Sequence, residues 1–142
     1  MHSPILSPVV ALVLWTLVIM LWMYATRLPA MRAAGISFKD LVGGQGRDLD
    51  KVVPAPIQWK AHNYNHLMEQ PTLFYALALT LAIAGLGDGL NATLAWTYVA
   101  LRIVHSLIQA TVNIVRYRFL AFMAASLVLM VLAVRAGMAL LF

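Results

Sequence analysis

One stretch decides the fold, Lys60-Ala-His-Asn-Tyr-Asn-His-Leu-Met-Glu-Gln-Pro-Thr-Leu-Phe-Tyr75, because it places ionisable and amide side chains at the start of a long apolar run. Two histidines, two asparagines and a glutamate are gathered there. Drawing an ionisable group into hydrocarbon costs several kcal/mol. Glu69 therefore requires a charged partner, a water-filled cavity or a function.

The composition of the whole chain is that of a membrane protein. Hydrophobic residues make up 63% of the 142 residues and charged residues 11%, whereas soluble domains average about 45–50% and 25%. The length predicts a single domain over residues 1–142. The chain contains no cysteine, which excludes disulfides, thiolate metal ligands and a cysteine nucleophile. The net charge of +5 comes from basic residues in and beside the connections, as at membrane flanks, so we expect no nucleic-acid partner.

Four apolar runs are long enough to cross a bilayer, whose hydrocarbon core of about 30 Å requires about 20 helical residues. The predicted fold class is an all-α integral membrane bundle of four transmembrane helices. The predicted spans are about residues 5–26, 57–86, 91–113 and 119–141.

Local signals refine these spans. Pro71 predicts a kink in the second helix within a turn of Glu69, because proline lacks an amide donor. Asn91 is the expected N-cap of the third helix. The glycine-rich and charged connection over residues 27–56 predicts a flexible linker, with a short interfacial segment at Lys39 and Asp40.

The distribution of basic residues predicts the orientation. Basic residues occupy or flank the first and third connections, whereas the short second connection has none. Four spans then put both termini outside and the basic loops in the cytoplasm. Arg135, in the last turns of the fourth span, is discordant, and we expect its side chain to snorkel outward. The basic residues concerned are Arg27, Arg32, Lys39, Arg47, Lys51, Lys60, Arg116 and Arg118.

Two polar stripes run inside the spans. On the second helix His62, His66 and Glu69 stand at i, i+4 and i+7, so they share one face. Because the second and third helices run in opposite directions, the two stripes can meet at one depth in the inner half of the bilayer. The stripe on the third helix is predicted to consist of Tyr98, Arg102, His105, Gln109, Asn113 and Arg116.

Three explanations of the stripes compete. The first is bundle cohesion, in which Glu69 pairs with Arg102 or Lys60. The second is a metal bound by His62, His66, Glu69 and His105, but the motif lacks the glutamate that follows the first histidine in HExxH, and we predict no metal. The third, which five ionisable groups on two facing stripes favour, is a zwitterionic peptide ligand. Its carboxylates would meet Arg102, Arg116 and Lys60, and its amine would meet Glu69.

The same residues resemble a known family, the membrane-associated proteins in eicosanoid and glutathione metabolism (MAPEG). The resemblance covers the whole chain in length, four spans and a long basic first connection. It is carried by the segment Asn63-Tyr-Asn-His-Leu-Met-Glu69-Gln-Pro71-Thr-Leu-Phe74-Tyr75 and by Arg102-x-x-His105. The Glu-x-Pro-x-Leu-Phe-Tyr portion looks like bacterial members, which implies the bacterial inner membrane.

The resemblance implies a homotrimer that binds glutathione between neighbouring subunits near the cytoplasmic side. Arg116, or Arg118, matches the arginine that stabilises the glutathione thiolate, which a guanidinium does by lowering the thiol pKa. Arg116 is thus the expected catalytic residue. The expected glutathione-binding residues are Glu69, Asn65, His66, Arg102, His105, Gln109, Arg118 and Lys60.

The implied activity is a glutathione-dependent transferase or peroxidase, in which the thiolate of the co-substrate glutathione attacks a lipophilic small molecule entering from the membrane lipids. Three positions depart from the family pattern: His66 stands where the family has asparagine, His62 where it has arginine, and Gln109 where it has tyrosine. The alternative is a non-catalytic protein of the same fold, whose stripes hold the trimer together or bind a lipid head group.

Overall fold

The computed structural model describes residues 2–37, 39 and 42–142, and every regular element in this part of the chain is helical. This confirms the all-helical fold class. The elements in chain order are α1 (Leu6–Ala33), the 3-10 helix η2 (Gly46–Lys51), α2 (Ala55–Leu67), α3 (Pro71–Ile83), α4 (Gly89–Ala110) and α5 (Val115–Leu141).

The first helix is longer than the apolar run predicts. We expected a polar connection from Arg27 onward, but α1 continues through Pro29 and ends at Ala33. Its last turn buries Met31, which is 6% exposed, and this apolar contact favours continuing the helix past proline. Gly35 then turns the chain with φ 74°, a conformation that glycine adopts without a steric cost. Of the expected interfacial segment at Lys39 and Asp40, Asp40 lies outside the described residues.

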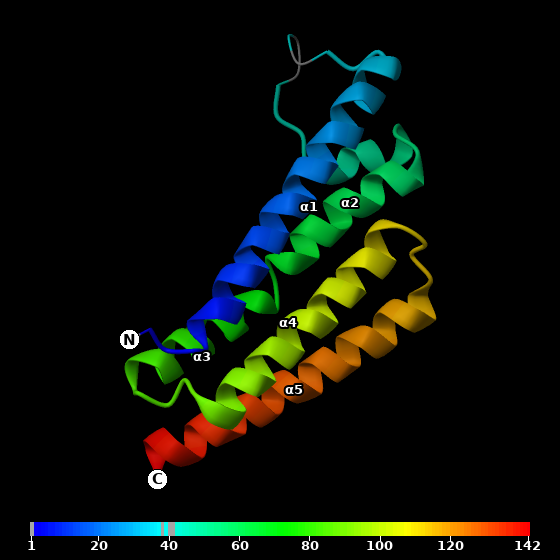
Figure 1. Cartoon of the computed structure of the whole chain (residues 1–142). Coiled ribbons are helices and arrows are strands. Elements are labelled where there is room, and N and C mark those ends of the chain that lie inside the picture. The colour runs from blue at the N-terminus through cyan, green and yellow to red at the C-terminus, as the bar shows by residue number, and fades with distance from the viewer. Residues whose placement is uncertain (1, 38, 40–41) are drawn as a thin grey trace.

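The expected kink at Pro71 is a complete break between α2 and α3 (Figure 1). Pro71 is the first residue of α3, the helical position at which a missing amide donor costs nothing. The break consists of residues 68–70, and Glu69 lies in the middle of it. The glutamate is therefore carried by a short link between two helices and not by a helix face.

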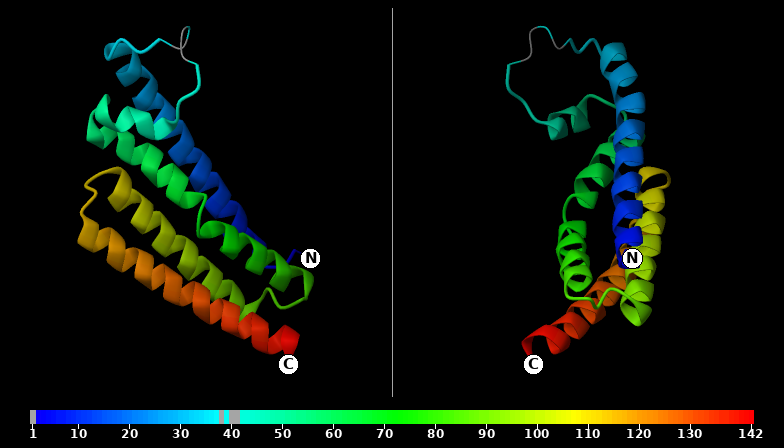
Figure 2. Two further views of the ribbon diagram at one scale, coloured as in Figure 1. Left: turned by 180° about the vertical axis from the view of Figure 1, so that it is seen from behind. Right: turned by 60° about the vertical axis from the view of Figure 1, so that its left-hand side comes forward.

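Helix α4 occupies the centre of the bundle and packs against α1, α2 and α5, while α3 packs against α1 and α5. The two termini lie at one end of the bundle, and the first connection and the α4–α5 turn lie at the other (Figures 1 and 2). The shared core is apolar. Its fully buried side chains include Leu12, Ile19, Phe74, Leu81, Tyr98 and Leu132.

Two helices are long and apolar enough to cross a membrane by length and composition, α1 and α5, each with a mean hydropathy of 2.3 over its best window. Much of their surface is exposed on the outside of the bundle. Helix α4 differs because its buried face is polar. That face includes Asn91, Tyr98, Arg102, His105 and Gln109.

The end of the third helix differs from the prediction. Helix α4 ends at Ala110, and Asn113 turns the chain with a positive φ of 51°. Helix α5 begins at Val115, so Arg116 belongs to its first turn. The expected stripe on the third helix is therefore wrong beyond Gln109, because the chain reverses direction at Asn113.

Asn91 is not the N-cap of α4, as the sequence suggested. That position is Asp88, which has extended backbone angles. Asn91 lies in the first turn, where its Nδ2 donates to the Leu86 carbonyl oxygen at 2.8 Å and its Oδ1 accepts from Arg135 Nε at 2.8 Å. The half-buried Arg135 guanidinium thus has an acceptor in the first turn of α4, and the expectation that its side chain snorkels outward stays a prediction.

Candidate functional site

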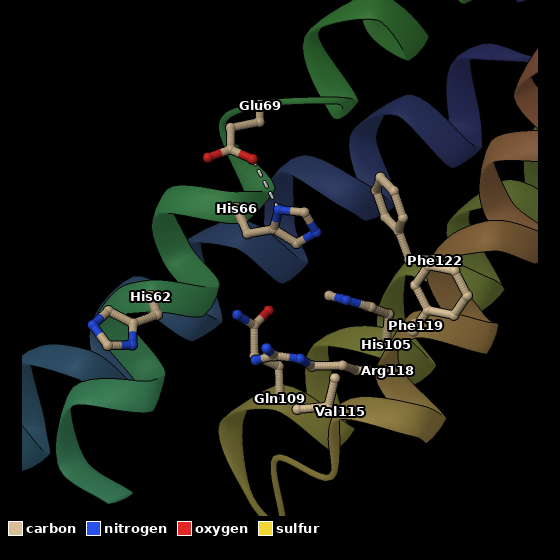
Figure 3. Close-up of a pocket in the computed structure, with 9 residues that line it drawn as sticks. All are labelled: His62, His66, Glu69, His105, Gln109, Val115, Arg118, Phe119 and Phe122. Atoms are coloured by element: carbon tan, nitrogen blue, oxygen red, sulfur yellow. Dashed lines mark hydrogen bonds and ion pairs between the residues drawn. The ribbon is translucent and has the colours of Figure 1, made fainter. Parts of the chain in front are cut away.

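A cavity of about 390 Å³ opens where the end of α2, the inner half of α4 and the start of α5 meet (Figure 3). It combines acidic, basic, amide and aromatic side chains. The lining residues are His62, His66, Glu69, His105, Gln109, Val115, Arg118, Phe119 and Phe122.

His66 and Glu69 form the pair at the α2–α3 break. Glu69 turns back toward the end of α2, and its Oε2 lies 2.9 Å from His66 Nδ1 (Figure 3). The Glu69 side chain is 68% exposed, whereas that of His66 is 23% exposed. Glu69 thus pairs with a histidine and with neither Arg102 nor Lys60, the two partners that the bundle-cohesion explanation required.

Arg102 lies behind His66 and is fully buried, at 0% exposure. Its Nη2 donates to the main-chain oxygen of His66 at 3.1 Å, and its Nη1 lies 3.4 Å from His66 Nε2. The guanidinium carbon also lies 5.7 Å from the centroid of the Phe122 ring, within reach of a cation–π attraction. Among the described residues no carboxylate forms an ion pair with it. A buried positive charge thus stands directly behind the cavity wall.

An aromatic cluster lines the middle of the cavity. The His66 and His105 rings are 4.8 Å apart, and Phe122 lies 5.3 Å from the first and 6.0 Å from the second. His105 Nδ1 and Gln109 Oε1 are buried without a hydrogen-bond partner in the part of the chain that the structure describes. Buried polar groups are nearly always paired, so these two atoms are suited to hold a ligand or water.

The structure separates the two arginines that follow α4. Arg118 lines the cavity, and its Nη1 donates to Asn113 Oδ1 at 2.7 Å. Arg116 is exposed and does not line the cavity. Two residues of helix separate about 200° around the axis, so the two side chains leave α5 on nearly opposite faces.

Two other expected ligand residues also lie outside the cavity. Lys60 Nζ donates to the Pro56 carbonyl oxygen at 2.6 Å and stands 5.3 Å from the Trp22 ring. Asn65 is exposed and does not line the cavity. Its neighbour Asn63 is fully buried and donates to Ser106 Oγ at 2.5 Å, which joins α2 to α4. The cavity therefore gathers the predicted residues His66, Glu69, His105, Gln109 and Arg118, but not Lys60, Asn65, Arg102 and Arg116, of which Arg102 lies behind its wall.

Sequence reasoning missed the contribution of α5. Val115, Phe119 and Phe122 line the cavity, but the fourth span was interpreted only as apolar packing. A signal was available, because Phe119 and Phe122 follow the basic pair at helical spacing. The spacing could have indicated an aromatic face beside a cation.

His62 connects the cavity to the first connection. Its Nε2 lies 2.9 Å from Asp50 Oδ1 of η2, and Gln58 Nε2 donates to the same oxygen at 2.7 Å. These hydrogen bonds, from Gln58 first and then from His62, lower the pKa of the Asp50 carboxyl below its ordinary value of 3.8. The described residues contain no group of three acidic or histidine side chains able to hold a metal ion.

A comparison with protein families finds that the model of the MAPEG family matches residues 5–138, which include all five α-helices apart from the last residues of α5. No curated protein and no solved structure matches the chain. The family match agrees with the all-helical fold and with the two apolar helices. The chain therefore belongs to the MAPEG family and is a helical membrane protein of the glutathione and eicosanoid metabolism group.

Proposed function

We propose that this protein is a membrane-bound glutathione-dependent transferase or peroxidase that acts on lipophilic electrophiles, with glutathione as its co-substrate. The observation that carries the proposal is the cavity between α2, α4 and α5, in which one arginine, one glutamate and three histidines meet two phenylalanines. Small-molecule sites have volumes of about 300–1,000 Å³, and this cavity falls within that range.

The polar groups of the cavity complement those of glutathione. The peptide carries two carboxylates, one ammonium group, two amide linkages and a thiol. The Arg118 guanidinium can hold a carboxylate or a thiolate, and the Glu69 carboxylate can hold the ammonium group. His105 Nδ1 and Gln109 Oε1, which have no hydrogen-bond partner among the described residues, can bind the peptide groups. The buried charge of Arg102 adds a positive potential behind them.

The chemistry requires a thiolate beside an apolar surface. A guanidinium next to the glutathione thiol favours the charged form and lowers the thiol pKa. The thiolate then forms a bond to the electrophile, and the leaving group departs with the electron pair. Phe119 and Phe122 supply an aromatic wall of the cavity on α5, whose apolar surface suits a lipophilic substrate.

We also propose that the protein assembles as a homotrimer. In a single chain Arg116 is exposed, so in a homotrimer it is free to reach the cavity of a neighbouring copy. Arg118 and Arg116 are thus two candidates for the arginine that stabilises the thiolate, one from the same chain and one from a neighbour. We propose Arg118 for this role, because it already lines the cavity.

The proposed topology is a single domain over residues 1–142 that crosses the bacterial inner membrane four times, through α1, the α2–α3 pair, α4 and α5. Both termini lie at one end of the bundle, and the basic first connection and the α4–α5 turn, which Arg116 and Arg118 follow, lie at the other (Figure 1). The positive-inside rule then assigns the connections to the cytoplasm and the termini to the outside. The cavity, between the α2–α3 break and the α4–α5 turn, lies toward the cytoplasmic side.

The test compares glutathione binding and the conjugation of a model aryl halide by the wild type, Arg118→Ala and Arg116→Ala, all purified in detergent. We expect Arg118→Ala to weaken binding about ten- to a hundredfold through the loss of charge-assisted hydrogen bonds, and Arg116→Ala to match the wild type. The reverse result would assign the role to Arg116 of a neighbouring copy. A wild type that neither binds nor conjugates glutathione contradicts the enzyme proposal.

The second candidate is a non-catalytic membrane protein whose polar groups serve assembly. It is favoured by the hydrogen bonds that join helices, from Asn63 to Ser106 and from Gln70 to Ser126 at 2.8 Å. This candidate predicts that Glu69→Gln lowers the melting temperature and that glutathione stabilises neither form. Stabilisation of the wild type by glutathione would exclude it.

A further inference from the structure

His66 stands between two side chains of opposite charge. Its Nε2 lies 3.4 Å from Arg102 Nη1, and its Nδ1 lies 2.9 Å from Glu69 Oε2. A guanidinium carries only donors, so the ring nitrogen that faces it must accept. The other ring nitrogen must then carry the proton that the Glu69 carboxylate accepts. Only a neutral imidazole with its proton on Nδ1 can make both hydrogen bonds, one to Glu69 and one from Arg102.

The other charged groups around the ring agree with this protonation state. Arg102 on α4 lies 3.4 Å from one ring nitrogen and Arg118 on α5 lines the same cavity, so two positive charges face the ring, while Glu69 is the one carboxylate among the residues that line the cavity. His105 on α4 packs against the ring at 4.8 Å, and its Nδ1 is unpaired among the described residues. His62, one turn earlier on α2, is turned to Asp50. In an imidazolium both nitrogens would donate, and the ring would then face the Arg102 guanidinium with a donor against a donor.

We propose that His66 is a positioning residue, held by Arg102 as the neutral Nδ1–H tautomer, which aims the Glu69 carboxylate into the cavity. Glu69 needs such a support, since it lies in the break between α2 and α3 and its side chain is 68% exposed. Arg102 fixes both ends of the histidine, through the main-chain oxygen at 3.1 Å and through Nε2. A charge buried on α4 thereby orders a carboxylate at the cavity mouth.

This inference rests on the proposed function in one respect, which is that Glu69 binds the ammonium group of glutathione. The tautomer itself can be measured without any ligand. The protein contains four histidines, so ¹⁵N-histidine labelling in detergent gives few ring signals, and His66→Asn identifies those of His66 by their disappearance. We expect a protonated Nδ1 and an unprotonated Nε2 at neutral pH. A protonated Nε2, which predominates in free neutral histidine, would overturn the proposal.

The positioning role predicts different glutathione affinities for two substitutions of His66, one by asparagine and one by leucine. Asparagine supplies one donor and one acceptor from a short side chain, whereas leucine keeps similar bulk without a polar atom. We expect His66→Leu to weaken glutathione binding about ten- to a hundredfold. We expect His66→Asn to remain within about threefold of the wild type, as a substitution that keeps both hydrogen bonds would.

The melting temperatures of both His66 variants show whether each is folded. A third variant, Glu69→Ala with His66 unchanged, gives the glutathione affinity expected when the carboxylate is lost completely. Equal loss of binding in His66→Asn and His66→Leu would overturn the positioning role. If the wild type does not bind glutathione, the proposed function fails, while the ¹⁵N signals of His66 still support or overturn the tautomer.

Discussion

Arg102 Nη2 donates a hydrogen bond of 3.1 Å to the main-chain oxygen of His66, so a buried guanidinium of α4 binds the C-terminal end of α2. The last four carbonyl groups of a helix have no partner inside it, and the helix dipole favours a cation there. Arg102 satisfies both needs in a part of the protein that is closed to water. The wall of the candidate cavity and the stability of the bundle therefore depend on the same side chain.

Replacing this arginine should be costly. Arg102→Ala removes the shorter of the two hydrogen bonds to the His66 main-chain oxygen, the other being from the Glu69 amide at 3.4 Å, and it also removes a large buried side chain. We expect it to lower the free energy of unfolding by roughly 2–4 kcal/mol. Denaturation in detergent measures the change. Arg116→Ala is the matched control, because this arginine is exposed and its loss should cost less than about 0.5 kcal/mol. Equal effects of the two substitutions would contradict the role given to Arg102.

Asn113, in the turn after α4, has two roles that substitutions can separate: its backbone turns the chain, and its side chain holds Arg118. Asn113 has φ 51°, and its Oδ1 accepts from Arg118 Nη1 at 2.7 Å. Asn113→Gly keeps the backbone conformation but releases Arg118, so the melting temperature should hold while glutathione affinity falls. Asn113→Val should lower stability by about 1–3 kcal/mol, because a β-branched residue is strained at positive φ. A glycine variant with unchanged affinity would show that Arg118 needs no anchor.

The break between α2 and α3 is joined to the other helices by Gln70. Its Nε2 donates to Ser126 Oγ at 2.8 Å, and its Oε1 accepts from the Tyr98 hydroxyl at 3.3 Å. In a double-mutant cycle of Gln70→Leu and Ser126→Ala we expect a coupling of about 0.5–1.5 kcal/mol, as for other hydrogen bonds between membrane helices. Thermal unfolding of the four proteins gives the value. Additive effects would mean that the contact contributes nothing to the fold.

The first connection should respond to acid. The pKa of Asp50 is lowered in the folded protein, so the stabilisation that its hydrogen bonds provide is complete above the ordinary value of 3.8 and is lost as the pH falls through the lower, folded value. A carboxyl ¹³C titration measures this pKa directly. Gln58→Leu should raise it further toward 3.8 than His62→Leu, since the bond from Gln58 contributes most. The opposite order would assign the main effect to His62.

Much of the fold was readable from the sequence because apolar run lengths and a single proline carry strong physical signals. Pro71 indicated a disturbance beside Glu69, and the structure has a break there. Helix ends were harder. Arg27 looked like the end of the first helix, but its guanidinium binds the Gly46 carbonyl oxygen of the connection, and this tertiary contact lets α1 continue.

The candidate site was also predictable only in part from the sequence. The stripe spacing brought His62, His66 and His105 to one cavity, because helical periodicity fixes which side chains share a face. Glu69 reaches the same cavity from the break between α2 and α3, which helical spacing does not describe. It could not separate Arg116 from Arg118, since the reversal at Asn113 depends on one residue with positive φ. The spacing of Phe119 and Phe122 indicated an aromatic face, but the place of that face in the cavity depends on how α5 packs on α4.

In the proposed four-span topology, the polar face of α4 also has a consequence for how the chain enters the bilayer during synthesis. An arginine at the centre of a membrane helix opposes insertion by about 2.5–3.5 kcal/mol, and α4 carries Arg102 together with His105 and Gln109 on the face that the finished bundle buries. Helix α5 is strongly apolar, follows after a short turn and packs along α4. The insertion machinery should therefore retain α4 until α5 has been translated, and the two helices should enter the lipid as a hairpin.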